Sequence, residues 1–579
     1  MLSFNQLTRN LKRDCTGFRT LRVALVGDSA TQLLAKALRG MSIERSFQML
    51  LFEAEYNQVE RLFLDATSEL YQQTFDYVIL FQSSHHFALS HAKAEPSARS
   101  RMADERLAFI ETAAQSFMER GTRMIVMNYP EFDDAVFGNY ANKLEESLLW
   151  QTRRLNMGLM ELANRLPLMS ICDVASLQSQ MGRSQLFDSH IYVSTEMVFS
   201  VDALPFIASR LMDIICAHEG CFKKCLIVDL DNTLWGGVIG DDGLEGIQLG
   251  HGLGIGKAFT EFQMWIKKLK QRGIIICVVS KNDEETAKDP FEHHPEMVLK
   301  LDDIAVFQAN WETKVDNIRT IQRILNIGFD SMVFLDDNPF ERNIVRENIP
   351  GITVPELPED PGEYLEYLYS LNLFETASYS QADKDRTKQY QVEAKRVSLS
   401  KTFTNESDFL KSLNMVSTVS GFTKFNTPRV AQLSQRSNQF NLRTIRYTEA
   451  DITALAEDPN VINLSFTLED KFGDNGLIAV IIMKKQDAET LFVDTWLMSC
   501  RVLKRGMENF TLNTMVERAR KAGYQRIIGE YLPTTKNKMV EQHYTDLGFQ
   551  PLAHTSTAQY VLDISQYKMR ECFITTKEV

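Results

Sequence analysis

The stretch Leu226–Trp235 constrains the fold of this chain more than any other segment. It begins with the apolar run Leu226–Val228, which has the length of a short buried strand, and it continues with Asp229 and Asp231. Ligands of open α/β sheets bind at the carboxyl ends of the strands. We therefore expect both carboxylates to point from one strand end into one crevice of an α/β domain.

Later segments supply polar groups of the kinds that such a crevice needs. Two further apolar runs end at Ser280 and at the pair Asp336 and Asp337. Lys314 stands at the start of a helical pattern of apolar residues. Carboxylate oxygens suit Mg²⁺, and a lysine offsets the charge of a phosphoryl group. The set therefore predicts a magnesium-dependent site for phosphoryl transfer.

Each of these groups has a role that its chemistry suggests. Asp229 is the candidate nucleophile, and Asp231 is the candidate acid that protonates the leaving group and later activates water. The candidate phosphate-binding residues are Thr233, Ser280 and Lys314. The candidate Mg²⁺ ligands are Asp229, Asp231, Asp336 and Asp337. The sequence leaves open which of the last two binds the ion directly.

The ordered series resembles the haloacid dehalogenase (HAD) superfamily of aspartate-dependent phosphotransferases. Several motifs more closely resemble the FkbH-like proteins over roughly residues 220 to 560, and the resemblance is looser before that. The motifs are Asp229–Gly240, His294–Met297, Phe334–Arg342, Val354–Pro358, Asn438–Asn441 and Asp494–Arg501. The resemblance implies a bifunctional glyceryl transferase and phosphatase. Such an enzyme dephosphorylates a glyceryl unit derived from 1,3-bisphosphoglycerate and loads it onto an acyl carrier protein for polyketide assembly.

Composition and charge narrow the classes of partner. The net charge of −13 argues against nucleic acid or an anionic membrane as the main partner. No apolar run approaches the roughly 18 residues of a membrane span, and the N-terminus lacks the apolar core of a signal peptide. The eight cysteines are sparse and irregularly spaced, which fits a reducing compartment, so we expect a cytoplasmic protein.

A second motif follows a predicted strand near the start of the chain. The run Leu21–Val26 predicts the strand, and the Gly-Asp-Ser sequence after it resembles the first block of the SGNH hydrolases, in which the serine is a nucleophile. Asp188 and His190 would be its partners, but they stand one residue closer together than that family's pattern requires. We therefore favour the interpretation that Asp28 and Ser29 cap a helix N-terminus. The sequence leaves open whether Ser29 is catalytic.

The last part of the chain predicts a strand at 491–497, a helix at 507–522 and a strand at 526–531. This order resembles the GNAT acyltransferases, which bind the pyrophosphate of coenzyme A at the start of such a helix. In the corresponding run here, Lys504 replaces the middle glycine, which leaves coenzyme A binding open. The arm of a carrier protein is the alternative ligand. The candidate residues for binding that arm are Arg501, Lys504, Arg505 and Gly506.

Cys500 is the candidate thiol for glyceryl transfer. It lies between a predicted strand and a helix N-terminus, with Arg501 and Arg505 close in sequence, and positive potential favours the thiolate. A thiolate could attack the acyl phosphate of 1,3-bisphosphoglycerate and hold the glyceryl unit as a thioester. The alternative is a buried cysteine that packs as a small apolar side chain. Both interpretations stay open.

These patterns predict an α/β fold class for the whole chain. We expect a multidomain protein of three α/β layer domains, the central one built on a HAD-like, Rossmannoid parallel sheet. A long helix is predicted over 142–166. The expected segments are an SGNH-like domain at 1–215, the HAD-like catalytic domain at 220–365, a helical connector at 366–404 and a GNAT-like acyltransferase domain at 405–579.

Two other functions remain as alternatives to the bifunctional enzyme. One is a Mg²⁺-dependent HAD phosphatase that acts on another metabolite and needs no carrier protein. The other is a non-catalytic scaffold with a HAD-like core. The complete set of acids, hydroxyl groups and lysine argues against the scaffold, because a chain without phosphoryl chemistry has little reason to keep them in this order.

Overall fold

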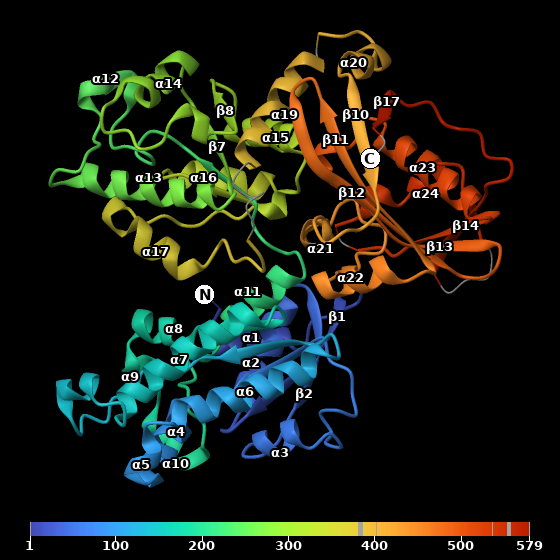
Figure 1. The fold of residues 1–579 in the computed structure, drawn as a ribbon. Helices are drawn as coiled ribbons and strands as arrows, with labels where there is room; N and C mark the ends of the chain where they lie inside the picture. The colour runs from blue at the N-terminus through green and yellow to red at the C-terminus, as the bar shows by residue number, and fades with distance from the viewer. Residues whose placement is uncertain (1, 380–385, 401, 535, 553–556, 578–579) are drawn as a thin grey trace. The chain divides into compact units, whose positions relative to one another are not determined.

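The chain forms three β-sheets, each layered with helices, in two compact units (Figure 1). A computed structural model describes residues 2–379, 386–400, 402–534, 536–552 and 557–577. The units are Met1–Ala217, which has one sheet, and His218–Val579, which has two. The predicted α/β fold class with three layer domains is confirmed. Within the described ranges, no helix has both the length and the apolar character that crossing a membrane requires.

The first unit is built on a parallel sheet in the order β2-β1-β3-β4-β5. Its strands are β1 (Arg19–Gly27), β2 (Phe47–Glu53), β3 (Tyr77–Phe81), β4 (Arg123–Met127) and β5 (Met169–Cys172). The helices α6 (Met102–Met118) and α7 (Leu148–Arg165) pack on one face. The strand order reverses between β1 and β3, which is where folds of this kind place their ligands.

The helix predicted over 142–166 is wrong at its start. Helix α7 begins only at Leu148, because the Ser147 hydroxyl accepts a hydrogen bond from the Trp150 amide and caps the helix there. Gly138–Lys143 forms a short 3-10 helix, η1. The other helices up to His218 are α1 (Phe4–Asn10), α2 (Gln32–Glu44), α3 (Val59–Leu64), α4 (Ser84–Lys93), α5 (Pro96–Arg99), α8 (Val174–Met181), α9 (Arg183–Leu186), α10 (Ser189–Thr195) and α11 (Leu204–His218).

The second unit begins with a parallel sheet in the order β8-β7-β6-β9. Its strands are β6 (Cys225–Val228), β7 (Ile275–Ser280), β8 (Val306–Ala309) and β9 (Met332–Leu335). Alternate residues of β6, β7 and β9 enter two cores, one against α13, α14 and α17 and the other against α15 and α16. The helices are α12 (Ile239–Gly246), α13 (Ile255–Gln271), α14 (Glu284–His293), α15 (Lys314–Leu325), α16 (Pro339–Asn348) and α17 (Tyr364–Leu371).

The other sheet of the second unit is mixed and has the order β15-β16-β14-β13-β12-β11-β10-β17. Its strands are β10 (Met415–Ser420), β11 (Val461–Asp470), β12 (Gly473–Lys485), β13 (Thr490–Met498), β14 (Arg526–Tyr531), β15 (Gln550–Pro551), β16 (Ala558–Asp563) and β17 (Ile574–Lys577). The helices around it are α20 (Glu406–Ser412), α21 (Thr427–Arg436), α22 (Glu449–Glu457), α23 (Met507–Lys521) and α24 (His543–Asp546).

Two neighbouring strands of this sheet separate towards one end. The parallel strands β13 and β14 pair only over Thr490–Val493 of β13. Beyond that point the chain's own segment 440–442 lies between them. The Leu442 amide donates to the Trp496 carbonyl at 3.2 Å, and the Leu442 carbonyl accepts from the Leu532 amide at 2.9 Å. The segment therefore satisfies backbone groups that the separated strands leave open.

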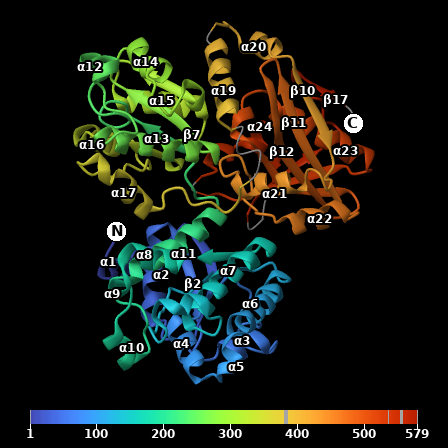
Figure 2. The same cartoon turned by 60° about the vertical axis from the view of Figure 1, so that its left-hand side comes forward.

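Helix α19 (Arg386–Ser400) contacts both sheets of the second unit (Figure 2). The Gln391 side chain donates to the Ile304 carbonyl at 2.9 Å, just before β8. The Arg396 guanidinium is 2.8 Å from the Asp470 carboxylate, at the end of β11. Residues 380–385 and 401 of the expected connector lie outside the described residues. Because α19 touches both sheets, it ties the parallel sheet to the mixed one.

Candidate active site

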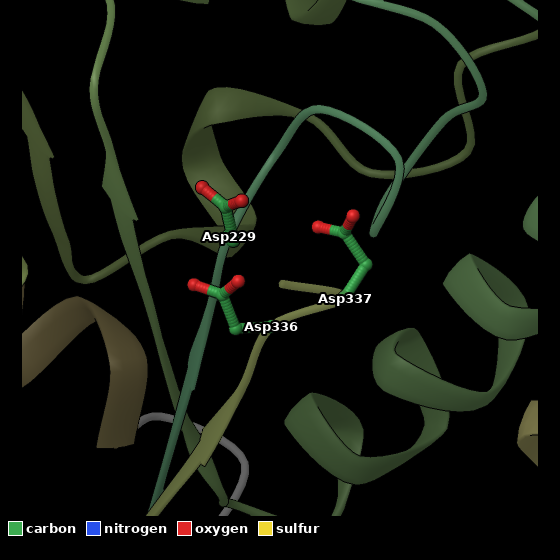
Figure 3. Close-up of side chains that lie close together, drawn as sticks. All are labelled: Asp229, Asp336 and Asp337. Atoms are coloured by element: carbon green, nitrogen blue, oxygen red, sulfur yellow. The ribbon is translucent and has the colours of Figure 1, made fainter. Parts of the chain in front are cut away.

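Three carboxylates meet at the ends of two neighbouring strands, where their side chains lie close together (Figure 3). Asp229 follows β6, and Asp336 and Asp337 follow β9. The strand register pairs Val228 with Leu335, and the Asp229 amide donates to the Leu335 carbonyl at 3.0 Å. Each aspartate offers one oxygen, and these oxygens all lie within 4.8 Å of one another. Such a set of hard oxygen ligands fits a divalent cation such as Mg²⁺.

The Lys314 ammonium lies against two of these carboxylates. Its Nζ is 3.0 Å from Oδ2 of Asp229 and 2.5 Å from Oδ2 of Asp336. Lys314 is only 5% exposed. It is the first residue of α15, whose N-cap, Thr313, accepts a hydrogen bond from the Asp316 amide. One ammonium faces three carboxylates, so the cluster has an excess of negative charge that a cation would neutralise.

Burial and crowding shift the pKa values of these groups. Burial raises the pKa of Asp229 to about 7, with Lys314 opposing the shift and Asp336 adding to it. Burial and the neighbouring Asp336 also raise the pKa of Asp337. Burial alone would lower the pKa of Lys314, but Asp229 and Asp336 outweigh that effect and raise it. The carboxyl group of Asp229 is therefore partly protonated near neutral pH when no cation is bound.

The Asp231 carboxylate is held by three donors. The Trp235 indole and the Ile239 amide each donate to Oδ1 at 3.0 Å, and the Asn282 side chain donates to Oδ2 at 2.7 Å. Sequence reasoning missed Asn282, although its position two residues after Ser280, just beyond β7, could have indicated it. These hydrogen bonds fix the orientation of the predicted acid and base.

The two predicted hydroxyl groups are buried at the same edge of the sheet. Thr233, predicted to bind phosphate, exchanges hydrogen bonds of 3.1 Å with the Asp337 carboxylate and amide. Ser280 ends β7 and accepts a hydrogen bond of 3.4 Å from Asn282. The hydroxyl of Thr233 therefore positions a candidate metal ligand, and that of Ser280 lies next to the group that orients Asp231.

Arg342 is a second residue that sequence reasoning missed. Its guanidinium donates to the main-chain carbonyls of Asp336 at 2.8 Å and Asp337 at 2.7 Å. Arg342 is almost fully buried, and its Nε contacts the Glu356 carboxylate at 3.0 Å. It fixes the backbone turn that carries both carboxylates. Arg342 ends one of the motifs quoted above, which is the signal that could have indicated it.

The predicted thiol and arm-binding residues lie at the mixed sheet. The backbone of Cys500 begins the short helix η5 (Cys500–Val502), and its side chain lies outside the described residues. The residues that follow and lead into α23 are Arg501, Lys504, Arg505 and Gly506. The ionic contacts of Arg505 are with Glu393 and Asp470. Arg505 therefore contacts acids other than Asp229, Asp336 and Asp337.

In the first unit, Ser29 is fully buried and its hydroxyl donates to the Asp28 carboxylate at 2.8 Å. The interpretation that Asp28 and Ser29 cap a helix is wrong, because Thr31 occupies the N-cap position of α2 and no side chain caps that helix. Asp188 instead caps α10, where it accepts a hydrogen bond from the His190 amide. The Asp188 carboxylate thus caps the helix that it precedes, α10.

Similar proteins identify the family. The crystal structure of the N-terminal part of protein BF1531 from Bacteroides fragilis, containing a phosphatase domain complexed with Mg, is 59% identical and has a TM-score of 0.64. The match covers 65% of this chain and 100% of that chain. A family model described as the FkbH N-terminal domain matches residues 22–216. The chain belongs to the FkbH family. The resemblance to FkbH-like proteins that the motifs indicated is thereby confirmed.

Two acetyltransferase structures are similar to a smaller part of this FkbH-family chain. The ribosomal-protein-S18-alanine N-acetyltransferase from Escherichia coli is 15% identical, covers 26% of this chain and 97% of its own, and has a TM-score of 0.20. The GNAT domain of S. lividans PAT is 17% identical, covers 25% of this chain and 89% of its own, and has a TM-score of 0.21. No match was found among curated proteins. The GNAT-like assignment of the last segment stays a prediction.

We expect the cation-free wild-type protein to lose stability relative to the Asp229→Asn variant as the pH rises from 6 to 8. The pKa of Asp229 in the folded protein, about 7, lies above its ordinary value of 3.8, so the folded protein keeps a proton that the unfolded chain has lost. This contribution is fully present at low pH and is lost as the pH rises through 7, which lowers the free energy of unfolding by about 1 kcal/mol. Urea unfolding in EDTA measures it.

The matched control for this experiment is Asp302→Asn, which changes an exposed aspartate and should keep the pH dependence. The variant Asp229→Asn should lose it, because an amide does not titrate. If the wild-type protein and Asp229→Asn changed their stability equally between the two pH values, the raised pKa of Asp229 would be contradicted.

Proposed function

We propose that this protein is a Mg²⁺-dependent phosphatase of the HAD type that also transfers a glyceryl unit to an acyl carrier protein. The observation that carries the phosphatase activity is the buried cluster of Asp229, Asp336 and Lys314. A carboxylate nucleophile beside an ammonium group and a cation site is what transfer of a phosphoryl group to aspartate needs. The phosphatase domain of the 59% identical B. fragilis protein supports the same chemistry.

The ligands proposed for Mg²⁺ are Asp229, the main-chain carbonyl of Asp231, and Asp336 or Asp337. The carboxylates fit the ion because their oxygens lie close together and outnumber the ammonium group of Lys314. When bound, Mg²⁺ neutralises negative charge on the phosphoryl oxygens and on these acids. The Mg complex of the B. fragilis protein supports this assignment.

The aspartates perform the reaction in two steps. A carboxylate oxygen of Asp229 attacks phosphorus, the bond from phosphorus to the leaving oxygen breaks, and Asp231 gives that oxygen a proton. Asp231 then takes a proton from a water that attacks the aspartyl phosphate, so inorganic phosphate leaves and Asp229 is restored. Ser280 and Lys314 hold the phosphoryl oxygens, and Asn282 keeps Asp231 oriented.

For glyceryl transfer we propose that the Cys500 thiolate attacks the acyl carbon of 1,3-bisphosphoglycerate. The bond from that carbon to the phosphate oxygen breaks, phosphate leaves, and a thioester forms on the cysteine. The thiol of a carrier protein later loses its proton, takes the acyl group and restores the Cys500 thiolate. The FkbH family membership of the chain and Arg501, which follows the cysteine in sequence, support this half of the proposal.

A second candidate function is a Mg²⁺-dependent phosphatase of another metabolite that uses no carrier protein. The same buried cluster favours it, and Cys500 would then be an ordinary packed cysteine. A non-catalytic scaffold is disfavoured, because Lys314, Asp229 and Asp336 are nearly fully buried charges. Such charges are costly to desolvate, and a scaffold would gain nothing from keeping them.

The variant Asp229→Asn is expected to lose Mg²⁺-dependent release of phosphate from p-nitrophenyl phosphate by at least about 10³-fold, because the amide cannot accept a phosphoryl group. A colorimetric phosphate assay with and without EDTA measures this. Asp302→Asn changes an exposed aspartate outside the cluster and should keep wild-type activity. Release that survives in Asp229→Asn would rule out this residue as the nucleophile.

The variant Asn282→Ala is expected to lower kcat for the same reaction by about 10–100-fold, since Asp231 loses one of its three donors and its orientation. KM should change little, because Asn282 is not proposed to bind the substrate. Asn343→Ala, on the exposed side of α16, is the matched control. Steady-state kinetics over a pH series would measure how far kcat depends on Asn282. An unchanged kcat would show that Asn282 does not orient Asp231 for the reaction.

Incubation with 1,3-bisphosphoglycerate is expected to add an acyl group to the wild-type protein and not to Cys500→Ala. Intact mass measurement detects the group, and a candidate carrier protein added afterwards should remove it and gain it. Cys572→Ala, which removes a different free and partly exposed cysteine, should still be acylated. If wild-type protein gains no mass and loads no carrier, the transferase half is wrong while the phosphatase half stands.

A further inference from the structure

An ion pair joins two segments at the carboxyl edge of the parallel sheet. The Lys281 ammonium lies 2.5 Å from the Glu341 carboxylate. Lys281 follows β7, directly after Ser280, and Glu341 lies in the first turn of α16, which follows β9. Strand β6 lies between β7 and β9 in the sheet. The pair therefore connects the two neighbours of the strand that leads to Asp229.

The position of this pair in the sheet brings it close to the candidate nucleophile. Neighbouring strands are about 4.8 Å apart, so the ends of β7 and β9 are about 10 Å apart with β6 between them. Lys281 and Glu341 meet over that gap, beside the end of β6. Helices α15 and α16 pack in the same core on one face of the sheet. The pair thus lies on the face from which Lys314 contacts Asp229.

We propose that Lys281 is a specificity-determining residue, which binds a second anionic group of the substrate while the aspartate cluster holds the phosphoryl group. This role rests on the proposed phosphatase activity. A lysine ammonium has three N–H donors. Among the described residues, the hydrogen bond of this ammonium goes to Glu341. Two donors therefore remain for a ligand, and the contact with Glu341 holds them beside the site.

The two ends of the ion pair differ in their exposure to solvent. The side chain of Glu341 is 10% exposed, whereas that of Lys281 is 42% exposed. The buried carboxylate thus fixes the position of the ammonium, and the ammonium stays accessible from solvent. A partly exposed ion pair adds little to the stability of a fold. Stability alone therefore gives little reason for a lysine at this position.

Two acids that follow Lys281 in sequence have other partners. Asp283 caps α14 with its own side chain, and Glu284 forms an ion pair with Lys288 one turn further along that helix. Neither carboxylate occupies the remaining donors of the Lys281 ammonium. The acid that Lys281 contacts is Glu341, from a different strand end.

The edge of the sheet around the pair is open to solvent. Trp311 follows β8, and Phe340 is the second residue of α16. Their side chains are 78% and 66% exposed, so no described segment covers them. A substrate that places its phosphoryl group at the aspartates can therefore extend its remaining part over this edge, where Lys281 lies.

The second anionic group has two possible sources, a carboxylate or a further phosphate. Both form charge-assisted hydrogen bonds with an ammonium group. An ester with an uncharged chain fills the phosphoryl position equally well but leaves the Lys281 donors to water. The site should therefore select phosphate esters that carry a second anion over uncharged esters of the same size.

The test compares three esters of one carbon skeleton, glycerol 3-phosphate, 3-phosphoglycerate and glycerol 1,3-bisphosphate. They differ in the group opposite the phosphate, which is a hydroxyl, a carboxylate or a second phosphate. With Mg²⁺, we expect the wild-type kcat/KM to be at least about tenfold higher for one of the charged esters than for glycerol 3-phosphate, as a hydrogen bond to a charged group would give. The difference should lie mainly in KM.

Two variants are expected to change this preference in opposite directions. Lys281→Gln removes the ammonium and should abolish the preference. Glu341→Gln keeps an acceptor for the ammonium but removes the negative charge beside it, so the preference should grow. Lys288→Gln, which removes a lysine of α14, is the matched control and should keep the wild-type preference. A pair with a structural role alone would make Lys281→Gln and Glu341→Gln act in the same direction.

The order of the charged esters identifies the second group. A higher kcat/KM for 3-phosphoglycerate would assign a carboxylate, and a higher value for glycerol 1,3-bisphosphate would assign a phosphate. A wild-type protein without preference for either would overturn the inference. So would an equal loss on all three esters in Lys281→Gln, because Lys281 would then hold the phosphoryl group.

Failure of this inference and failure of the proposed function are distinguishable. Wild-type protein that hydrolyses p-nitrophenyl phosphate through Asp229 but treats the three esters alike would overturn the role of Lys281 alone. Wild-type protein that hydrolyses none of these phosphate esters would overturn both, since Lys281 would then have no substrate to select.

Discussion

The burial of Lys314 between Asp229 and Asp336 is the interaction on which the candidate active site depends. Buried charges are stable only when each has a partner, and here one ammonium serves two carboxylates. The arrangement leaves Asp229 and Asp337 with raised pKa values, because burial disfavours their charged forms. The cluster can therefore relieve its charge in two ways, by holding a proton or by holding a cation. The phosphoryl transfer to Asp229 that we propose would require the second, since a protonated carboxyl is a poor nucleophile.

Backbone geometry sets where these charges lie. Parallel strands β6 and β9 end in register, so the residues after them emerge side by side, and the Asp229 amide is bonded to the carbonyl that precedes Asp336. Arg342 holds the two carbonyls of the aspartate pair, and Thr233 holds the Asp337 side chain. Each carboxylate is thus positioned by a strand end and by a second contact from elsewhere. Preorganisation of this kind reduces the reorganisation that the reaction would otherwise require.

The carboxylates at the ends of β6 and β9 could be predicted from the sequence, because each follows its apolar run directly along the chain. Strands β6 and β9 are continuous apolar runs, and polar residues follow each run directly. A strand of a parallel sheet that is buried on both faces can be recognised from such a run alone. Asn282 and Arg342 could not be assigned in the same way. Asn282 meets Asp231 across 51 residues of chain, and only the pairing of β6 with β7 brings them together. Strands β2, β10, β11 and β12 were missed for a similar reason, because pairing with distant strands decides their structure.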